Sequence, residues 1–224
     1  RTVHKEKTMK YYAINGSPRK KNNTATVLAK ALEGVVAAQP DAQTEMLHLY
    51  DYTYKGCISC FECKRIGGKS YGKCAVKDDL APILEKLSLA DGIIFGSPIY
   101  FKGITGEMRS FFERFLFPYL VYDATYSSIA PKKMKTAFIY TMNVTEAFMR
   151  SMDYPEHLSG MEYFTGRMLT PPSVLYVNDT YQFMDYSKYK VECFSEEAKL
   201  KRKNEEFPKD CQKAFELGMA MARP

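Results

Sequence analysis

The sequence predicts an α/β fold, a three-layer sandwich with one five-stranded parallel sheet between two layers of helices. Two observations carry this prediction: five short segments have strand-like composition, and stretches of helical periodicity separate them. A third is that Gly, Ser, Pro or Asn follows most of these segments, where loops are expected. Strands that alternate with helices favour a doubly wound parallel sheet.

The start of the chain predicts a strand–helix–strand unit. Lys10–Asn15 is rich in aromatic and β-branched residues and breaks abruptly at Gly16-Ser17-Pro18. A helix is expected from about Thr24, because apolar residues recur on one helical face until Pro40. Thr44–Leu49 alternates enough to form the second strand.

The same alternation continues to the end of the chain. A helix is expected after Asp78-Asp79, either of which can cap it. Further strands are expected at Asp91–Gly96, Lys135–Tyr140 and Ser173–Val177, and helices at about Gly106–Phe115, Asp153–Met168 and Ser195–Met221, the last interrupted at Pro208. We predict that residues 1–8 are an N-terminal extension and that residues 9–224 form one domain with a C-terminal helical extension.

The composition excludes several classes of protein. The chain of 224 residues has 14 Phe and 17 Tyr, too many for a disordered protein. No apolar run approaches the roughly 18–20 residues that span a bilayer, and no leader-like segment is visible, so we expect a cytoplasmic protein without a membrane partner. The net charge of +6 is spread over several clusters without a nucleic-acid motif, so we expect no nucleic-acid partner.

The loop after the first strand is suited to an anion. It leads into a helix N-terminus, where free N–H groups and the helix dipole favour negative charge. The candidate phosphate-binding residues are Ser17, Asn22, Asn23 and Thr24, with positive charge from Arg19 and Lys20. Neither the triphosphate P-loop nor the dinucleotide fingerprint is present. The alternative is a polar loop that binds nothing.

The loop after the third strand is suited to a planar ring. Pro98, Ile99, Tyr100 and Phe101 offer flat or apolar surface beside exposed backbone N–H groups. The alternative is that Tyr100 and Phe101 pack into the core. Both loops are expected at the carboxyl edge of the sheet, where ligands bind in open α/β folds. A ring at one end and a phosphate at the other together indicate flavin mononucleotide (FMN).

Four cysteines, Cys57, Cys60, Cys63 and Cys74, lie within eighteen residues. This crowding, without a secretory signal, indicates metal or redox chemistry rather than structural disulfides. Four thiols suit a [4Fe-4S] cluster, but zinc and free thiols or a labile disulfide remain alternatives. Cys193 and Cys211 are interpreted as ordinary thiols.

Three segments together resemble the NADPH-dependent FMN reductase group of the flavodoxin-like superfamily. They are GSPRKKNNTATVLAKAL, the C-x-x-C-x-x-C segment ending in CAVKDDL, and ADGIIFGSPIYFKGITGEMRSFFERF. The branch most similar includes iron–sulfur flavoproteins. The resemblance covers about Met9 to Phe115 and is loose beyond it. In that branch the fourth cysteine follows a few residues after the third, whereas ten residues separate Cys63 from Cys74 here.

The resemblance implies a flavodoxin-like fold, bound FMN, and a homodimer or homotetramer. It places the FMN phosphate at Ser17, Arg19, Asn23 and Thr24, the ribityl chain and ring at Pro98 to Phe101, and a third flavin loop at Thr141 to Asn143. It implies no catalytic side chain, because the flavin carries the hydride chemistry.

Three functions follow as hypotheses. The first is an oxidoreductase that passes electrons from NAD(P)H through FMN to a quinone, flavin or other small acceptor. The second is an iron–sulfur flavoprotein that transfers electrons through a cluster at Cys57, Cys60, Cys63 and Cys74. The third is a binding module that retains FMN without catalysis.

Overall fold

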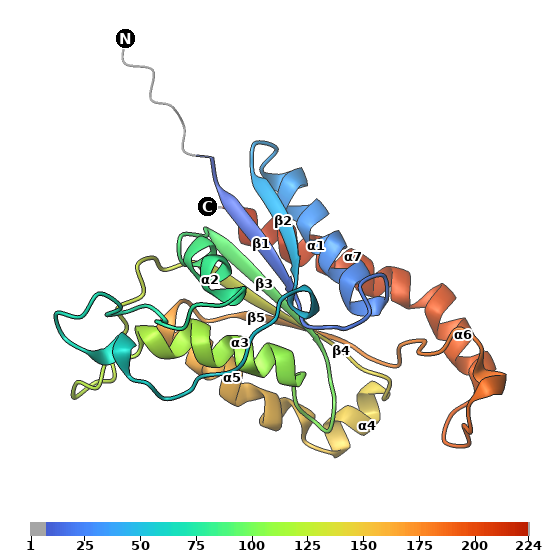
Figure 1. Cartoon of the computed structure of the whole chain (residues 1–224). Helices are drawn as coiled ribbons and strands as arrows, with labels where there is room; N and C mark the ends of the chain where they lie inside the picture. Colours follow the sequence, from blue (N-terminus) through green and yellow to red (C-terminus); the bar gives the residue numbers. More distant parts are fainter. Residues whose placement is uncertain (1–7, 224) are drawn as a thin grey trace, which may run out of the picture.

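A computed structural model describes residues 8–223, and the predicted parallel sheet is confirmed (Figure 1). Its five strands are β1 Lys10–Asn15, β2 Gln43–His48, β3 Gly92–Pro98, β4 Lys135–Thr141 and β5 Ser173–Val177. They hydrogen-bond in the order β2-β1-β3-β4-β5, and every pairing is parallel. The strand order reverses between β1 and β3, and ligand crevices of such sheets form at this switch point.

Helices cover both faces of the sheet, which gives three layers (Figure 1). On one face lie α1 Asn23–Ala38 and α7 Phe207–Ala222. On the other lie α2 Leu80–Ser88, α3 Gly106–Leu116 and α5 Tyr154–Met168. Two shorter helices, α4 Glu146–Ser151 and α6 Glu196–Glu205, lie toward the carboxyl ends of the strands, and α6 projects from the body of the molecule.

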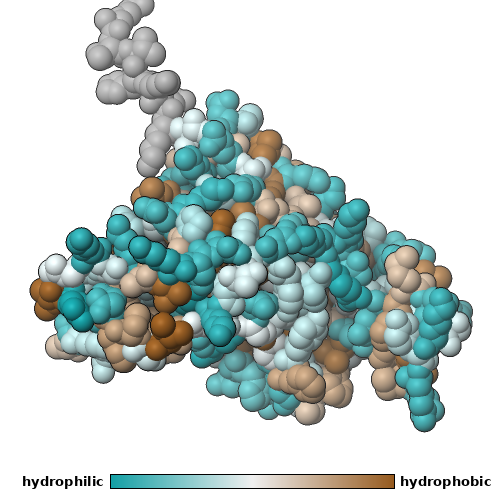
Figure 2. Space-filling view, viewed as in Figure 1, coloured by the Kyte–Doolittle hydropathy of each residue, from teal (hydrophilic) through white to brown (hydrophobic). Residues whose placement is uncertain are grey.

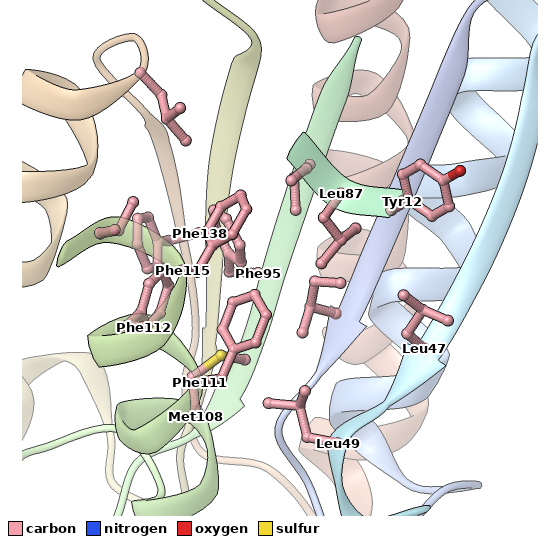
Figure 3. Close-up of a cluster of buried hydrophobic side chains, with 14 of the residues drawn as sticks. Tyr12, Leu47, Leu49, Leu87, Phe95, Met108, Phe111, Phe112, Phe115 and Phe138 are labelled. Carbon is pink, nitrogen blue, oxygen red and sulfur yellow. The ribbon is translucent and has the colours of Figure 1, made fainter. Parts of the chain in front are cut away.

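A group of aromatic rings fixes α3 to the sheet (Figure 3). Phe95 of β3 packs against Phe112 of α3 at 4.8 Å and against Phe138 of β4 at 5.2 Å between ring centroids. Phe111 and Phe115 stack on each other at 5.3 Å. All five side chains are almost fully buried, so α3 is held rigidly along its length.

On the opposite face α1 and α7 approach each other closely because glycines face the partner helix. A Cβ at Gly34 would lie 1.9 Å from the carbonyl oxygen of Phe215, and one at Gly218 would lie 1.8 Å from that of Ala31. No side chain fits at either position. This contact sets the position of α1, whose first turn forms part of the predicted phosphate site.

The structure departs from the predicted elements in a few places. The helix α4 is not predicted, because six residues are too short for a periodic signal. The terminal helix breaks at Glu206 rather than at Pro208, which sits in the first turn of α7, where proline is tolerated. The predicted extension, apart from Thr8, lies outside the described residues. In the described part of the chain, no helix is long and apolar enough to cross a membrane.

Candidate functional site

Three predicted loops meet at the carboxyl edge of the sheet. The Gly16 N–H donates to the Gly96 carbonyl at 2.8 Å, which joins the loops after β1 and β3. The Ile99 N–H donates to the Thr141 carbonyl at 2.9 Å, which joins the loops after β3 and β4. The buried hydroxyls of Thr24 and Thr141 lie 2.7 Å apart. Residues far apart in the sequence therefore form one continuous edge.

The loop after β1 has free donors where it enters α1. Ser17 is buried, and its hydroxyl accepts from the Arg19 N–H at 3.2 Å. The first N–H of the helix to reach an intrahelical carbonyl belongs to Thr26, which donates to Asn22 at 3.0 Å. The N–H groups of residues 23 to 25 therefore lack intrahelical acceptors and lie at the positive end of the helix dipole. This geometry is suited to a phosphate.

Two of the predicted phosphate residues contact the segment between β5 and α6. Arg19 Nη1 donates to the carbonyl of Gln182 at 2.7 Å, and Asn23 Nδ2 donates to the carbonyl of Tyr181 at 2.9 Å. Residues 178–195, here called the β5–α6 segment, therefore lie beside the loop after β1. No local pattern in the sequence predicts this contact.

Two more of the predicted phosphate residues, Lys20 and Asn22, do not contact the β5–α6 segment. Lys20 forms an ion pair with Asp51, just beyond β2. Asn22 occupies the N-cap position of α1, but its side chain makes no capping hydrogen bond. The Lys20 ammonium is therefore held by Asp51, and the Asn22 side chain caps no N–H of α1.

The loop after β3 presents aromatic side chains to solvent. Two backbone hydrogen bonds of 2.9 and 3.0 Å close a tight turn between Tyr100 and Gly103. At the turn, Phe101 and Lys102 have φ angles of +50° and +65°, a region that side chains other than glycine disfavour. Phe101 is fully exposed and Tyr100 is 47% exposed, so the alternative that they pack into the core is wrong. Pro98 and Ile99 are half-buried at the base of this loop.

The loop after β4 carries a buried acceptor without a partner. Among the described residues, nothing hydrogen-bonds to Asn143 Oδ1. The Asn143 carbonyl accepts from the ammonium of Lys199, which is 3% exposed and also pairs with Asp179. Lys199, which the sequence analysis missed, thereby ties α6 to this loop. An unpaired buried oxygen is costly unless a ligand donor reaches it.

These residues fit FMN. The first turn of α1 and the Arg19 guanidinium suit the phosphate, and Asn143 Oδ1 suits an N–H or hydroxyl donor of the flavin or ribityl chain. Tyr100 and Phe101 supply exposed rings for stacking.

The four clustered cysteines line one cavity. Cys57, Cys60, Cys63 and Cys74 all line this cavity, and its walls also include the apolar side chains of Ile58, Phe61, Phe117 and Pro118. Cys63 is buried, Cys74 is partly buried, and the other two are exposed at the rim. The ten-residue insert before Cys74 does not keep that thiol from the other three.

The four thiols have the ligand type and number that a [4Fe-4S] cluster takes, with one thiolate for each of its four irons. Zinc also accepts four thiolates. Across residues 8–223, no three His, Cys, Asp or Glu side chains converge as ligands of a single metal ion.

The backbone around Cys60 has an unusual conformation. Ser59 and Phe61, on either side of it, have φ angles of +54° and +56°. Residues other than glycine disfavour this region, so the backbone on both sides of Cys60 is strained.

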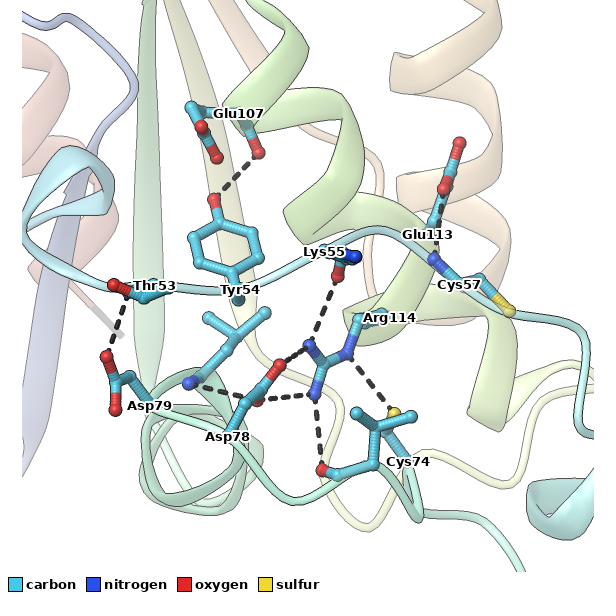
Figure 4. A network of polar contacts seen from close by, with 12 residues as sticks. Thr53, Tyr54, Lys55, Cys57, Cys74, Asp78, Asp79, Glu107, Glu113 and Arg114 are labelled. Carbon is cyan, nitrogen blue, oxygen red and sulfur yellow. Dashed lines mark hydrogen bonds and ion pairs between the residues drawn. The ribbon is translucent and has the colours of Figure 1, made fainter.

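The last turn of α3 holds both ends of the cysteine loop (Figure 4). The Cys57 N–H donates to Glu113 Oε2 at 3.2 Å, and Arg114 Nε donates to Cys74 Sγ at 3.3 Å. A Cβ at Gly56 would lie 2.5 Å from Glu113 Oε2, so a side chain there would displace the Glu113 carboxylate from this contact. Neither of these α3 residues was among the predicted site residues. A signal existed, because Arg114 falls three positions after Phe111 on the apolar face of the helix.

Burial and charge shift two pKa values at this site. Burial raises the pKa of the Cys63 thiol, an effect that Lys64 opposes and the neighbouring cysteines reinforce. Ligation at Cys63 therefore has to displace a proton. Burial alone would raise the pKa of the Asp78 carboxyl, but hydrogen bonds and charge from Arg114 outweigh it and hold that pKa below its usual value of 3.8.

The outer surface of the cysteine loop is apolar in patches. Ile58, Phe61 and Ile66 are 62%, 52% and 90% exposed. Brown patches lie among hydrophilic surface at the end of the molecule where Figure 1 places this loop (Figure 2).

Residues 9–142, more than half of the chain, match the profile of a family described as NADPH-dependent FMN reductase. The chain belongs to this family, a class of flavin-dependent reductases.

Two curated relatives have names that state a narrower class of protein than the family profile does. A stretch of 106 residues is 39% identical to an iron-sulfur flavoprotein of Methanocaldococcus jannaschii, covering 47% of this chain and 51% of that protein. The chain is also 40% identical over 106 residues to an iron-sulfur flavoprotein of Archaeoglobus fulgidus, covering 47% of this chain and 48% of that protein. The chain thus spans about half the length of the curated relatives it matches.

Solved structures show the same fold over nearly the whole chain. The NAD(P)H:quinone oxidoreductase from Methanothermobacter marburgensis superposes with a TM-score of 0.70 at 15% identity, covering 97% of this chain and 99% of that one. An azoreductase from Bacillus anthracis gives 0.66 at 13% identity, covering 95% and 100%. At these identities the likeness establishes the flavodoxin-like fold alone.

Proposed function

We propose that this protein is an iron–sulfur flavoprotein that binds FMN at the carboxyl edge of the sheet and a [4Fe-4S] cluster at Cys57, Cys60, Cys63 and Cys74. The observation that carries the proposal is the shared cavity of these four thiols. The relatives named iron-sulfur flavoproteins support it. Of the hypotheses drawn from the sequence, this one was the alternative to a simple NAD(P)H oxidoreductase.

The chain's residues have separate tasks in this proposal. Bound FMN would exchange electrons in pairs or singly, and the cluster would exchange single electrons. Arg19, Asn23 and the first turn of α1 bind the phosphate, which requires the two side chains to exchange Tyr181 and Gln182 carbonyls for phosphate oxygens. Tyr100 and Phe101 stack against the ring, and Thr24 and Thr141 hold their loops together. No side chain acts as a nucleophile.

The test is anaerobic purification followed by a visible spectrum and an iron and acid-labile sulfide assay. We expect one FMN and about four irons per chain. Cys63→Ser should abolish iron while FMN stays bound. Cys193→Ser is the matched control, because Cys193 is an exposed thiol of the β5–α6 segment, and it should retain both. FMN without iron in the unmodified protein would contradict the proposal.

A second candidate function is reduction of a small acceptor such as a quinone or free flavin by NAD(P)H through FMN alone. The family match supports it, because residues 9–142 contain the flavin loops after β1 and β3 and the start of the loop after β4. In that case the four cysteines are free thiols, and substituting any of them should leave NAD(P)H oxidation unchanged. A Cys63→Ser variant with full activity toward every acceptor would favour this candidate.

We also propose a homo-oligomer. A groove between α3 and α5, lined by Phe112, Leu116, Met161 and Phe164 among others, offers a surface for a second copy. Light scattering coupled to gel filtration should give a mass of twice or four times 25.7 kDa. A mass of one chain would contradict the oligomer.

A further inference from the structure

Arg114 uses every donor of its guanidinium at the base of the cysteine loop (Figure 4). Nε donates to Cys74 Sγ at 3.3 Å, as described above. Nη1 donates to the Lys55 carbonyl at 3.2 Å and to Asp78, and Nη2 donates to the Val76 carbonyl at 3.3 Å and to Asp78 at 2.9 Å. The side chain is 0% exposed. A guanidinium has five N–H groups, so all are satisfied within the protein.

The acceptors lie on both stems of the loop that carries the four cysteines. Lys55 precedes Cys57 by two residues, and Val76 and Asp78 follow Cys74. Asp78 Oδ1 also accepts from the Leu80 N–H at 3.2 Å, at the start of α2. Arg114 thus closes the loop at its base, and residues 64–73 form an insert above the closed stem. The position of Cys74 follows from this closure rather than from its spacing to Cys63.

The Nε–H bond has a chemical consequence. One carboxylate, Asp78, pairs with the two terminal nitrogens, and Nε faces the sulfur in the cavity wall. Hydrogen bonds to the sulfur ligands and nearby charge set the reduction potentials of iron–sulfur clusters. A donor with positive charge stabilises the reduced, more negative state. Lysine cannot reproduce this contact, because its ammonium has three donors and no planar fork.

We propose that Arg114 positions Cys74 as the fourth cluster ligand and raises the reduction potential of the cluster through its Nε–H bond to Cys74 Sγ. This inference rests on the proposed function. Arg114 does not touch the reacting atoms of a substrate, so it is a positioning residue.

The experiment compares variants of the anaerobically purified holoprotein. For each variant, iron and sulfide per chain are assayed and the cluster midpoint potential is measured by spectroelectrochemical titration. In Arg114→Lys the charge stays near Asp78 but the Nε–H bond is lost. We expect the equilibrium constant for reduction of the cluster to fall about tenfold. This lowers the midpoint potential by about 59 mV for a one-electron couple. The FMN potential should not change.

Two further variants separate tuning from loosening of the loop. Asp78→Asn removes a negative charge but leaves the Nε–H bond, so it should leave the cluster potential unchanged or raise it. Arg150→Lys makes the same exchange at an exposed ion pair with Glu146 and should change nothing. If Arg114→Lys loses its iron while Asp78→Asn keeps it, the positioning of Cys74 is supported directly.

The outcomes distinguish the inference from the function on which it rests. A wild-type protein that takes up no iron overturns the proposed function, and the inference with it. A wild-type protein that holds the cluster, with an unchanged or raised potential in Arg114→Lys, overturns the inference alone. Equal downward shifts, or equal loss of iron, in Arg114→Lys and Asp78→Asn also overturn it, because they would show a purely structural role.

Discussion

The flavin loops and the cysteine loop lie at opposite ends of α3 and are held in different ways. At the start of the helix, the hydroxyl of Thr105 donates to the Gly16 carbonyl at 2.8 Å, and backbone hydrogen bonds link the remaining loops. At its end, two side chains, Glu113 and Arg114, tether the cysteine loop. The two positions are about 14 Å apart along the helix, at roughly 1.5 Å per residue. The difference implies that single substitutions can remove the cysteine site and spare the flavin site.

Replacing Arg114 with Met should have the largest effect. It leaves Asp78 and three other acceptors without their donor, and losing one partner of a buried ion pair costs about 3–5 kcal/mol. We expect that drop in the free energy of unfolding at pH 7, measured by urea denaturation, together with loss of iron. FMN affinity should stay within a factor of about two. A large loss of FMN affinity would refute the separation of the two regions.

The pH dependence of this loss has a definite sign. Because Arg114 holds the pKa of Asp78 below 3.8, the pair contributes stability above that value and loses it as the pH falls through the lowered pKa. The stability difference between wild type and Arg114→Met should therefore be constant near neutral pH and shrink below pH 3.8. Urea denaturation at neutral pH and at about pH 3 tests this. A difference that grows in acid would contradict the assigned pair.

Gly218→Ala should affect the opposite region. Its Cβ would lie 1.8 Å from the Ala31 carbonyl oxygen and force α7 away from α1. Overpacking of this kind costs about 1–3 kcal/mol. We expect lower stability in thermal unfolding and weaker FMN binding, with iron content unchanged. The matched control is Gly160→Ala on α5, where an added Cβ meets nothing within 4 Å. A loss of iron in Gly218→Ala would show that the regions are coupled.

Thr24→Val tests one contact within the flavin site. It removes the 2.7 Å hydroxyl contact with Thr141 and nearly preserves side-chain shape. A hydrogen bond of this kind contributes about 1 kcal/mol, so FMN affinity should fall about fivefold. Thr26→Val is the control on the same helix, because its hydroxyl contacts only the Asn22 carbonyl, at 3.2 Å. Quenching of FMN fluorescence gives both affinities, and equal losses would contradict the role of Thr24.

The turn after β3 should show the smallest change in stability. Phe101→Gly and Lys102→Gly each place glycine where φ is positive and should each stabilise the fold by about 1 kcal/mol. Phe101→Gly should also weaken FMN binding, because it removes the exposed ring, whereas Lys102→Gly should not. Thermal unfolding measures the stability of both variants, and titration with FMN measures their affinity for the flavin. If both variants bind FMN as well as wild type, Phe101 does not stack on the flavin.

Much of the fold could be predicted because its signals are local. β1, β3 and β5 end at or just before Asn15, Pro98 and Asn178, and the apolar stripe of α3 identifies its buried face. The loops after β1 and β3 could be assigned to one edge because parallel strands end on the same side of a sheet, and the family resemblance added the loop after β4. Lys20 shows the limit of that argument. The sequence predicts that Lys20 lies in the loop after β1. It does not predict the ion pair with Asp51, because that residue lies just beyond the neighbouring strand β2.

By itself, the sequence determined the order of strands and helices, the loops that carry the flavin residues, and the presence of four clustered thiols. Only the tertiary structure decided that Cys74 shares a cavity with the other three, that Arg114 holds it, and that Lys199 reaches the loop after β4. The physical reason is distance along the chain. Periodicity and turn preferences act over a few residues, whereas these contacts join positions 40 and 56 residues apart. Which buried charge meets which acceptor is set by how the helices pack on the sheet.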